Sequence, residues 1–253
     1  MSERSPARTR RPVPDHMFGG RLRGSYFLDL EVIGADDIAP HVRLITMASP
    51  DLHGFEYAPG QDLWFEFPDD DRALRRRYTI RRSDPAEGIA DFEIEIHDAR
   101  GPATCWAAKA ELGDHLGAIG PRGGIGLRQT ATSHLFVVDD SSMPAAFVML
   151  EALPADTPAT ALLVTSHGAR SRPAPTGASA TSLVWLDQAE MLERLSDLHP
   201  AASTAAYIFG ERHLVRTAEE LLVGGGLDRD AVASKAYWRR DQPNASHGEP
   251  SWN

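Results

Sequence analysis

The chain has 253 residues, 42% of them hydrophobic and 25% charged, which is the composition of an ordinary globular protein with one large or two modest domains. Its formal net charge of −10 at pH 7 argues against nucleic acid as a partner, and its single cysteine, Cys105, excludes a disulfide framework and a cysteine-ligated metal site. No apolar run reaches membrane-spanning length and the start lacks the apolar core of a secretory signal, so we expect a cytoplasmic protein without a membrane partner.

The first half of the chain predicts a small antiparallel barrel. Residues 1–24 are dominated by Arg, Pro and Ser and predict a disordered tail. The next hundred residues read as short strands separated by turn signals, a pattern typical of a barrel, here of six strands. One helix, predicted at 104–112, has Pro102 ahead of it and Gly113 after it. The predicted strands are 26–33, 42–48, 62–67, 77–82, 91–97 and 115–118.

After Gly126 the pattern changes to apolar runs that alternate with helical segments, which predicts βαβ units around a parallel sheet. The predicted strands are 134–138, 160–165, 182–186, 205–209 and 233–239, and the predicted helices are 143–153, 188–197 and 212–224. We therefore expect a barrel domain at 25–128, a small α/β domain at 129–240 and a loose tail at 241–253. Ferredoxin-reductase-like flavoproteins have this order of domains.

The arginine-rich run 75–82 contains the first candidate site, Arg76-x-Tyr78-Thr79. A tyrosine flanked by arginines offers a flat π-face beside fixed positive charges, a combination that suits a flavin dinucleotide. The alternative is a solvated, basic end of a strand.

Two further candidates lie at turns. In Gly101–Trp106 a loop leads into a helix, whose first backbone N–H groups and Thr104 hydroxyl can bind a phosphate; the alternative is a plain N-cap by Thr104. Cys105 has no His-plus-acid pattern beside it, so we expect a small packed residue and not a nucleophile. In Gly120–Gly124 the glycines allow a close backbone approach to a ligand, or form a turn between domains.

Two candidates belong to the second half. Val138–Ala145 follows the first predicted α/β strand, where a doubly wound sheet binds dinucleotides, but the G-x-G-x-x-G fingerprint is absent. Tyr237–Arg240 places two aromatic residues before two arginines, which suits a planar, charged ligand; the alternative is that Trp238 is the last core residue and the arginines are solvated. No HExxH, Walker A or G-x-S-x-G motif and no metal-ligand cluster is found in the sequence.

Taken together and in this order, the segments from Tyr26 to Arg240 resemble the siderophore-interacting protein family, FAD-dependent ferric-siderophore reductases of the ferredoxin-reductase superfamily. The resemblance is carried by 38–43, 49–52, 76–81, 91–97, 101–107, 120–123, 226–230 and 237–240.

The resemblance implies FAD as cofactor, with Tyr78 against the isoalloxazine, Thr79 near its N5 edge and Arg76 on the phosphates. The start of the helix would hold the pyrophosphate. The cofactor-binding residues so implied are Arg76, Tyr78, Thr79, Arg81, His97, Ala103, Thr104, Trp106, Gly120, Arg122, Gly123 and Trp238. Candidates for binding the ferric siderophore are Arg81, Lys235, Arg239 and Arg240, and those for NAD(P)H are Asp139, Asp140, Ser141 and Ser142.

The chemistry of such a protein belongs to the flavin, so no catalytic side chain is expected. The expected function is reduction of ferric siderophores to release Fe(II), with electrons from NAD(P)H or ferredoxin. The alternatives are a flavoenzyme of secondary metabolism that acts on an organic substrate, or a flavoprotein whose FAD is structural.

Three departures from the family pattern bear on the electron donor. Val138 replaces a glycine and adds bulk where a reductant would approach, and Asp241 replaces another glycine. In place of an acidic stretch stands Ser166–Arg172, whose Arg170 and Arg172 either favour the 2′-phosphate of NADPH or belong to a solvated loop.

Overall fold

A computed structural model describes residues 10–14, 24–68, 74–96, 101–167, 172–176 and 181–240. The chain divides between Gly124 and Ile125 into two compact units, the barrel unit and the α/β unit. None of the helices in these ranges is long and apolar enough to cross a membrane.

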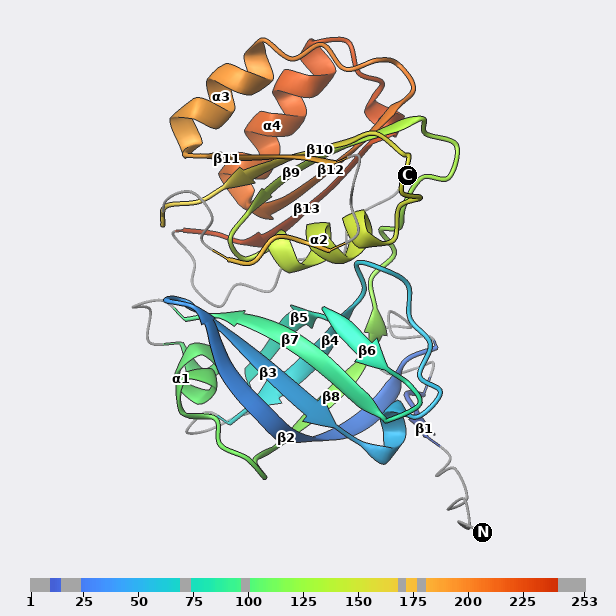
Figure 1. Ribbon diagram of the computed structural model, residues 1–253, viewed down its shortest axis with the longest axis vertical. Helices are drawn as coiled ribbons and strands as arrows, with labels where there is room; N and C mark the ends of the chain where they lie inside the picture. Colours follow the sequence, from blue (N-terminus) through green and yellow to red (C-terminus); the bar gives the residue numbers. More distant parts are fainter. Residues whose placement is uncertain are drawn as a thin grey trace. The chain divides into compact units, whose positions relative to one another are not determined.

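In its described residues the barrel unit is one curved antiparallel sheet with a single α-helix (Figure 1). The hydrogen-bonded order is β5-β4-β8-β2-β3-β7-β6, with β1 paired to β2. The two edge strands, β5 and β6, follow each other in the chain, which brings the edges of the sheet together. The elements are β1 (Arg11–Pro12), β2 (Tyr26–Ala39), β3 (Val42–Ala48), the short 3-10 helix Pro50–Leu52, β4 (Asp62–Phe67), β5 (Leu74–Thr79), β6 (Arg82–Asp84), β7 (Ile89–Glu95), α1 (Pro102–Lys109) and β8 (His115–Arg122).

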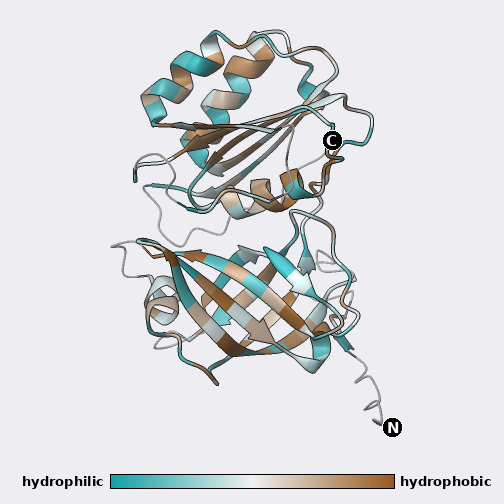
Figure 2. Cartoon of the chain, in the orientation of Figure 1, coloured by the Kyte–Doolittle hydropathy of each residue, from teal (hydrophilic) through white to brown (hydrophobic). Residues whose placement is uncertain are grey.

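The interior of the barrel unit is built by period-2 alternation along the strands (Figure 2). On β2 the residues Leu28, Leu30 and Val32 are buried and their neighbours in sequence face outward. Aromatic rings fill the centre, where Phe65 of β4 meets Phe92 of β7 edge-on with ring centroids 4.9 Å apart.

The predicted barrel was correct in kind and differs in two details. The single strand predicted at 77–82 is two strands, because the N–H of Ile80 donates to Gln61 and the N–H of Arg81 donates to Asp91, so the chain crosses from one edge of the sheet to the other. The prediction of a disordered tail over residues 1–24 is wrong for residues 10–14. There β1 pairs with β2, and Val13 is buried on the outside of the sheet against Ile119.

The α/β unit is a parallel five-stranded sheet in the order β11-β10-β9-β12-β13. Helix α2 covers one face and helices α3 and α4 cover the other (Figure 1). The elements are β9 (Ser133–Asp139), α2 (Met143–Glu151), β10 (Ala159–Val164), β11 (Thr181–Leu186), α3 (Gln188–Ser196), β12 (Thr204–Glu211), α4 (Arg212–Gly224), the 3-10 turn Arg229–Ala231 and β13 (Val232–Trp238).

The central strand β9 shows why this unit is a sandwich of three layers. Phe136 and Val138 pack under α2, whereas Leu135 and Val137 pack under α3 and α4, and all four are buried. A strand that is covered on both faces reads as the continuous apolar run seen in the sequence. Strand order reverses between β9 and β12, so the carboxyl ends of these two strands form the switch point of the sheet.

Candidate functional site

Strand β5 presents Arg76 and Tyr78 on one face. The ring of Tyr78 is half-buried and lies edge-on to Phe65 and Phe67, with centroid distances of 6.0 and 5.9 Å. Burial raises the pKa of the Tyr78 phenol, and the Arg76 guanidinium opposes this only in part, so the ring is neutral at physiological pH. Thr79, at the end of the strand, is buried.

The arginines around Tyr78 are largely engaged with carboxylates and do not form an open cationic patch. Arg81 shows this best: its side chain is 16% exposed and its Nε lies 3.0 Å from Glu93. The candidate role of Arg81 toward cofactor or substrate therefore requires it to keep or exchange this partner, and that role stays a prediction. The other pairs are Arg75–Glu66 at 2.6 Å, Arg77–Asp62 at 3.7 Å and Arg82–Asp91 at 2.7 Å.

Helix α1 begins two residues earlier than predicted and ends three residues earlier. Gly101 is the N-cap and makes no side-chain capping bond, so the alternative of an N-cap by Thr104 is wrong. Thr104 occupies the third helical position, and the N–H of Cys105 is the first to bond within the helix, to Gly101 at 2.9 Å. The backbone N–H groups of Ala103 and Thr104 therefore have no acceptor within the helix, which is the arrangement that binds phosphate.

The faces of α1 show which residues touch the barrel. Ala103, Thr104 and Ala107 are buried, and Trp106 packs on Phe67 with centroids 5.6 Å apart. Cys105 is exposed, so the expectation of a packed cysteine is wrong.

Packing against β4 explains the glycine at position 120, near the end of β8. A Cβ at Gly120 would lie 2.2 Å from Leu63 Cδ2 and 3.2 Å from the Asp62 carbonyl oxygen, so a side chain there would displace the buried Leu63 and crowd the backbone of β4. Gly123 has φ of +103°, a backbone conformation that favours glycine. Arg122 is buried, with its guanidinium 4.5 Å from the Trp64 ring centroid.

Two residues of β4 link the predicted cofactor residues of the barrel unit, one by side-chain contact and one by strand pairing. Phe67 touches both Tyr78 and Trp106. Asp62 is the register partner of Thr79 on one side and of Arg122 on the other. Residues from β5, α1 and β8 thus converge on a single strand. His97 lies outside the described residues.

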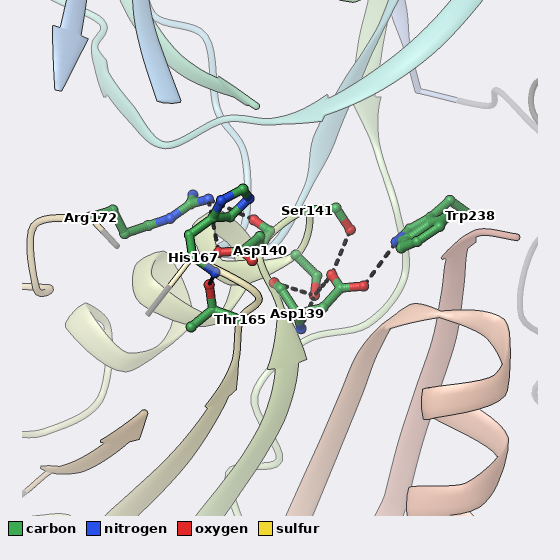
Figure 3. A network of polar contacts seen from close by, with 8 residues as sticks. Asp139, Asp140, Ser141, Thr165, His167, Arg172 and Trp238 are labelled. Atoms are coloured by element: carbon green, nitrogen blue, oxygen red, sulfur yellow. Dashed lines mark hydrogen bonds and ion pairs between the residues drawn. The ribbon is translucent and has the colours of Figure 1, made fainter. Parts of the chain in front are cut away.

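In the α/β unit, the switch point is occupied by the Asp139 carboxylate (Figure 3). It accepts hydrogen bonds from Ser141 Oγ at 2.6 Å, Ser142 Oγ at 3.0 Å, the Glu211 N–H at 2.7 Å and Trp238 Nε1 at 2.8 Å. Burial raises the pKa of Asp139, and these hydrogen bonds oppose the shift. Three strands, β9, β12 and β13, are thereby joined at their carboxyl ends.

Gly210 of β12 is a residue of this network that was not among the sequence predictions. Its φ is +134°, and a Cβ would lie 2.5 Å from the Asp139 carboxylate carbon. A glycine just before the end of an apolar strand, followed by Glu211, was the available signal.

The remaining NAD(P)H candidates turn inward. Ser142 is completely buried, and its hydroxyl also lies 2.9 Å from the Phe209 carbonyl, an alternative acceptor for its one proton. Asp140 is buried beside Arg172, whose Nη2 donates to the Asp140 carbonyl at 2.8 Å (Figure 3). The assignment of Asp139 to Ser142 to NAD(P)H stays a prediction.

Two of the departures from the family pattern have structural explanations. Arg172 does not belong to a solvated loop, because its side chain is 1% exposed; Arg170 lies outside the described residues. Val138 is buried in the core beneath α2, so its bulk fills the core and does not face the crevice.

The end of β13 carries the last group of candidates. Lys235 Nζ lies 5.3 Å from the Tyr237 ring centroid, and Tyr237 stacks on Phe209. Trp238 is 38% exposed, so it is not a core residue. Arg239 is half-buried and Arg240 exposed. Their roles toward a siderophore, and that of Trp238 toward the cofactor, stay predictions.

An antiparallel barrel followed by a five-stranded parallel sheet defines the ferredoxin-reductase-like class. A ferredoxin reductase of carbazole 1,9a-dioxygenase superposes with a TM-score of 0.72 at 17% identity, covering 84% of this chain and 69% of that one, which shows the shared fold. A siderophore utilization protein from T. fusca superposes with a TM-score of 0.74 at 26% identity, covering 88% and 96%.

Two family models place the chain within that class. Residues 57–125 match the siderophore-interacting FAD-binding domain, and residues 131–241 match the siderophore-interacting protein family. The chain belongs to the siderophore-interacting protein family, and its barrel unit carries that family's FAD-binding domain.

Three proteins of known name are similar to parts of the chain. Ferric vibriobactin reductase ViuB of Vibrio cholerae is 26% identical over 192 residues, 70% of this chain and 69% of that protein. The NADPH-dependent ferric-chelate reductase of Escherichia coli is 29% identical over 177 residues, 68% and 69%. The mycobactin import protein IrtA of Mycobacterium tuberculosis is 31% identical over 134 residues, 50% of this chain but only 16% of IrtA.

Proposed function

We propose that the protein is an FAD-dependent oxidoreductase that reduces the iron of a ferric siderophore and so releases Fe(II). The observation that carries the proposal is that Tyr78, helix α1 (through Trp106) and the end of β8 all meet β4, within the residues that match the family's FAD-binding domain. The names of ViuB and of the E. coli relative support the same reaction class.

The residues present suit the cofactor. Tyr78 offers a neutral aromatic face, held in orientation by two phenylalanine rings, against which a planar ring system stacks. Arg76 supplies positive charge on the same face of β5, and the N–H groups of Ala103 and Thr104, which have no acceptor within the helix, supply donors for a pyrophosphate. The N-cap residue, Gly101, has no side chain that could cap these groups.

When bound, FAD supplies the electron transfer, since a flavin can accept two electrons from a donor and pass them singly to Fe(III). The side chains bind and orient the reactants, and none is required to move a proton. Fe(II) is held far less tightly than Fe(III) by hard oxygen chelators, so reduction favours release of the metal. For the ferric siderophore we propose Lys235, Arg239 and Arg240, which suit an anionic chelate.

For the electron donor we propose NADPH, by analogy with the E. coli relative, with ferredoxin as the competing donor. The proposed reaction and its donor are tested together by anaerobic absorbance spectroscopy of the purified protein, first with NADPH and then with a ferric siderophore. We expect the flavin band to bleach with NADPH and to return with the chelate while Fe(II) appears, trapped by a ferrous-specific chelator.

Other outcomes separate the parts of the proposal. Bleaching by reduced ferredoxin alone would replace the donor and leave the reaction intact. A flavin band that responds to no donor would contradict the reductase. Failure to take up FAD, even in excess, would contradict the cofactor site.

A further inference from the structure

One side chain holds the C-terminal end of α1. Arg43, from the barrel unit's strand β3, donates from Nη1 to the carbonyls of Ala107 at 3.0 Å and Ala108 at 2.7 Å. Its Nη2 lies 3.4 Å from the carbonyls of Ala110 and Ala35. The Arg43 side chain is 19% exposed, so these contacts are made largely out of water.

The contacts of Arg43 match what the end of a helix lacks. The last carbonyls of any α-helix have no intrahelical donor and carry the negative end of the helix dipole. A guanidinium offers several donors in a fixed plane together with a full positive charge. Arg43 supplies both to three carbonyls of the last turn and the residue after it.

α1 depends on such an anchor more than a longer helix would. It has eight residues, below the length at which an isolated helix is stable, and its buried face includes Ala103 and Ala107, which bury little apolar area. Trp106 is its one large side chain in contact with the barrel, through Phe67. At the N-terminal end the N-cap residue, Gly101, supplies no side-chain capping bond. Trp106 near the middle of the helix and Arg43 at its end therefore tie it to the sheet.

Arg43 also contacts an irregular part of strand β2. Nη2 reaches the Ala35 carbonyl and Nε lies 3.8 Å from the Asp37 carboxylate. Ala35 and Asp37 lie on β2 between two shifts in the register of β2 with β3. The side chain thus joins the β2–β3 hairpin to the helix.

We propose that Arg43 is a positioning residue for the cofactor: by clamping the C-terminal carbonyls of α1 it fixes the place of the Ala103 and Thr104 N–H groups at the other end, which receive the FAD pyrophosphate. The inference rests on the proposed function, in which α1 holds that pyrophosphate. A helix moves as a rigid rod about 12 Å long, so a loosened C-terminal turn displaces the N-terminal one. Arg43 itself touches no cofactor in this scheme.

The test compares two flavins on the full-length apoprotein. Dissociation constants for FAD and for riboflavin, which has the ring but no pyrophosphate, are measured by flavin fluorescence for the wild type, Arg43→Lys and Arg43→Gln. We expect both variants to bind FAD about tenfold more weakly, the scale of one or two lost charge-assisted hydrogen bonds, with riboflavin affinity unchanged. Arg82→Lys is the matched control: this arginine is also paired with an aspartate in the same sheet, but it makes no contact with α1 in the described residues.

Each result has one meaning. A selective loss of FAD affinity supports the positioning role. Equal FAD affinity in wild type and variants overturns it and leaves the proposed function standing. Equal losses for FAD and riboflavin also overturn it, because they indicate general damage to the barrel unit. A wild type that binds neither flavin overturns the proposed function and this inference with it. Arg43→Lys keeps the charge and serves if Arg43→Gln does not fold.

Discussion

Tyr78 combines a neutral ring, locked between Phe65 and Phe67, with the charge of Arg76 on the same strand face. Replacing both residues by alanine removes the proposed stacking surface and the proposed phosphate partner at once. We expect Arg76→Ala with Tyr78→Ala to give a colourless protein with the fold retained, measured by the flavin absorbance of the purified protein and by circular dichroism.

The conservative pair Arg76→Lys with Tyr78→Phe is the control for that variant. It keeps a ring and a positive charge, so we expect most of the flavin to remain. A double alanine variant still saturated with FAD would refute the assignment of this site.

Gly210 is the residue that allows Asp139 to occupy the switch point. Its φ of +134°, and the 2.5 Å that would separate an added Cβ from the carboxylate carbon, leave an alanine no room. We expect Gly210→Ala to lower the free energy of unfolding by about 2–4 kcal/mol, measured by urea denaturation.

A matched glycine is available at the end of α4. A Cβ at Gly224 meets nothing within 4 Å and its backbone is helical, so we expect Gly224→Ala to be neutral or to stabilise by about 0.5–1 kcal/mol. If Gly210→Ala is as stable as Gly224→Ala, the network in Figure 3 does not constrain the backbone as described.

At the scale of elements, β9 and β12 are joined at their amino ends as well. His134 of β9 stacks on Tyr207 of β12 with ring centroids 5.9 Å apart, and the Tyr207 hydroxyl accepts from the Arg128 N–H at 2.7 Å. Burial lowers the pKa of His134. In the unfolded chain the same imidazole titrates near its ordinary pKa, so between the two pKa values the unfolded state binds more protons.

Stability should therefore be full above the ordinary histidine pKa and should fall as the pH drops below it toward the lowered pKa of folded His134. Urea denaturation at a series of pH values measures this. We expect His134→Gln to flatten the slope in that window, while the same change at His213, exposed on α4, leaves it in place. An unchanged slope in His134→Gln would mean that another group causes the loss.

The strands and helices were the most predictable part, because their periodicity reports burial directly. β9 reads as a continuous apolar run since it is covered on both faces, and β2 alternates since it is covered on one. The predicted strand boundaries were wrong where a hydrogen bond between residues far apart in the sequence decides them. Nothing local in 77–82 indicates that Ile80 bonds back to Gln61 and Arg81 across to Asp91, which splits the strand.

The candidate site was predictable in its motifs and not in its supports. Tyr78, Thr104 and Arg122 stand in short patterns that resemble a known family. Arg43 also ends one such pattern, 38–43, but its bonds to the end of α1, like the closeness of Gly210 to Asp139, join residues more than 60 positions apart in the sequence. A single sequence carries no sign of such partners. The burial of Arg172 was missed for the same reason, since its acceptor is the distant Asp140 carbonyl.

At the scale of the whole molecule, each unit has its own apolar core, so a ligand can stabilise one core directly. A cofactor bound by the barrel unit should raise the free energy of unfolding of that unit by about 2.7 kcal/mol at a free concentration of 100 times its Kd. Hydrogen exchange read by mass spectrometry, with and without FAD, assigns the gain to segments of the chain.

We expect protection to rise throughout the barrel strands β2, β4 and β8, including buried amides that no cofactor touches. The variant that lacks both Arg76 and Tyr78 should show no gain at the same FAD concentration. Protection confined to the α/β unit would contradict FAD binding by the barrel.

The hydrogen bond from Trp238 to Asp139 also makes the intrinsic fluorescence of Trp238 a probe of this site. Indole emission depends on the charge and hydration near the ring, and here the donor N–H faces a carboxylate while 38% of the residue meets solvent. Only five tryptophans occur in the chain, so a Trp238→Phe difference spectrum isolates this one signal. Loosening of the carboxyl end of β13 from β9 would then be visible as a change in colour and lifetime of emission, in real time and without any added label.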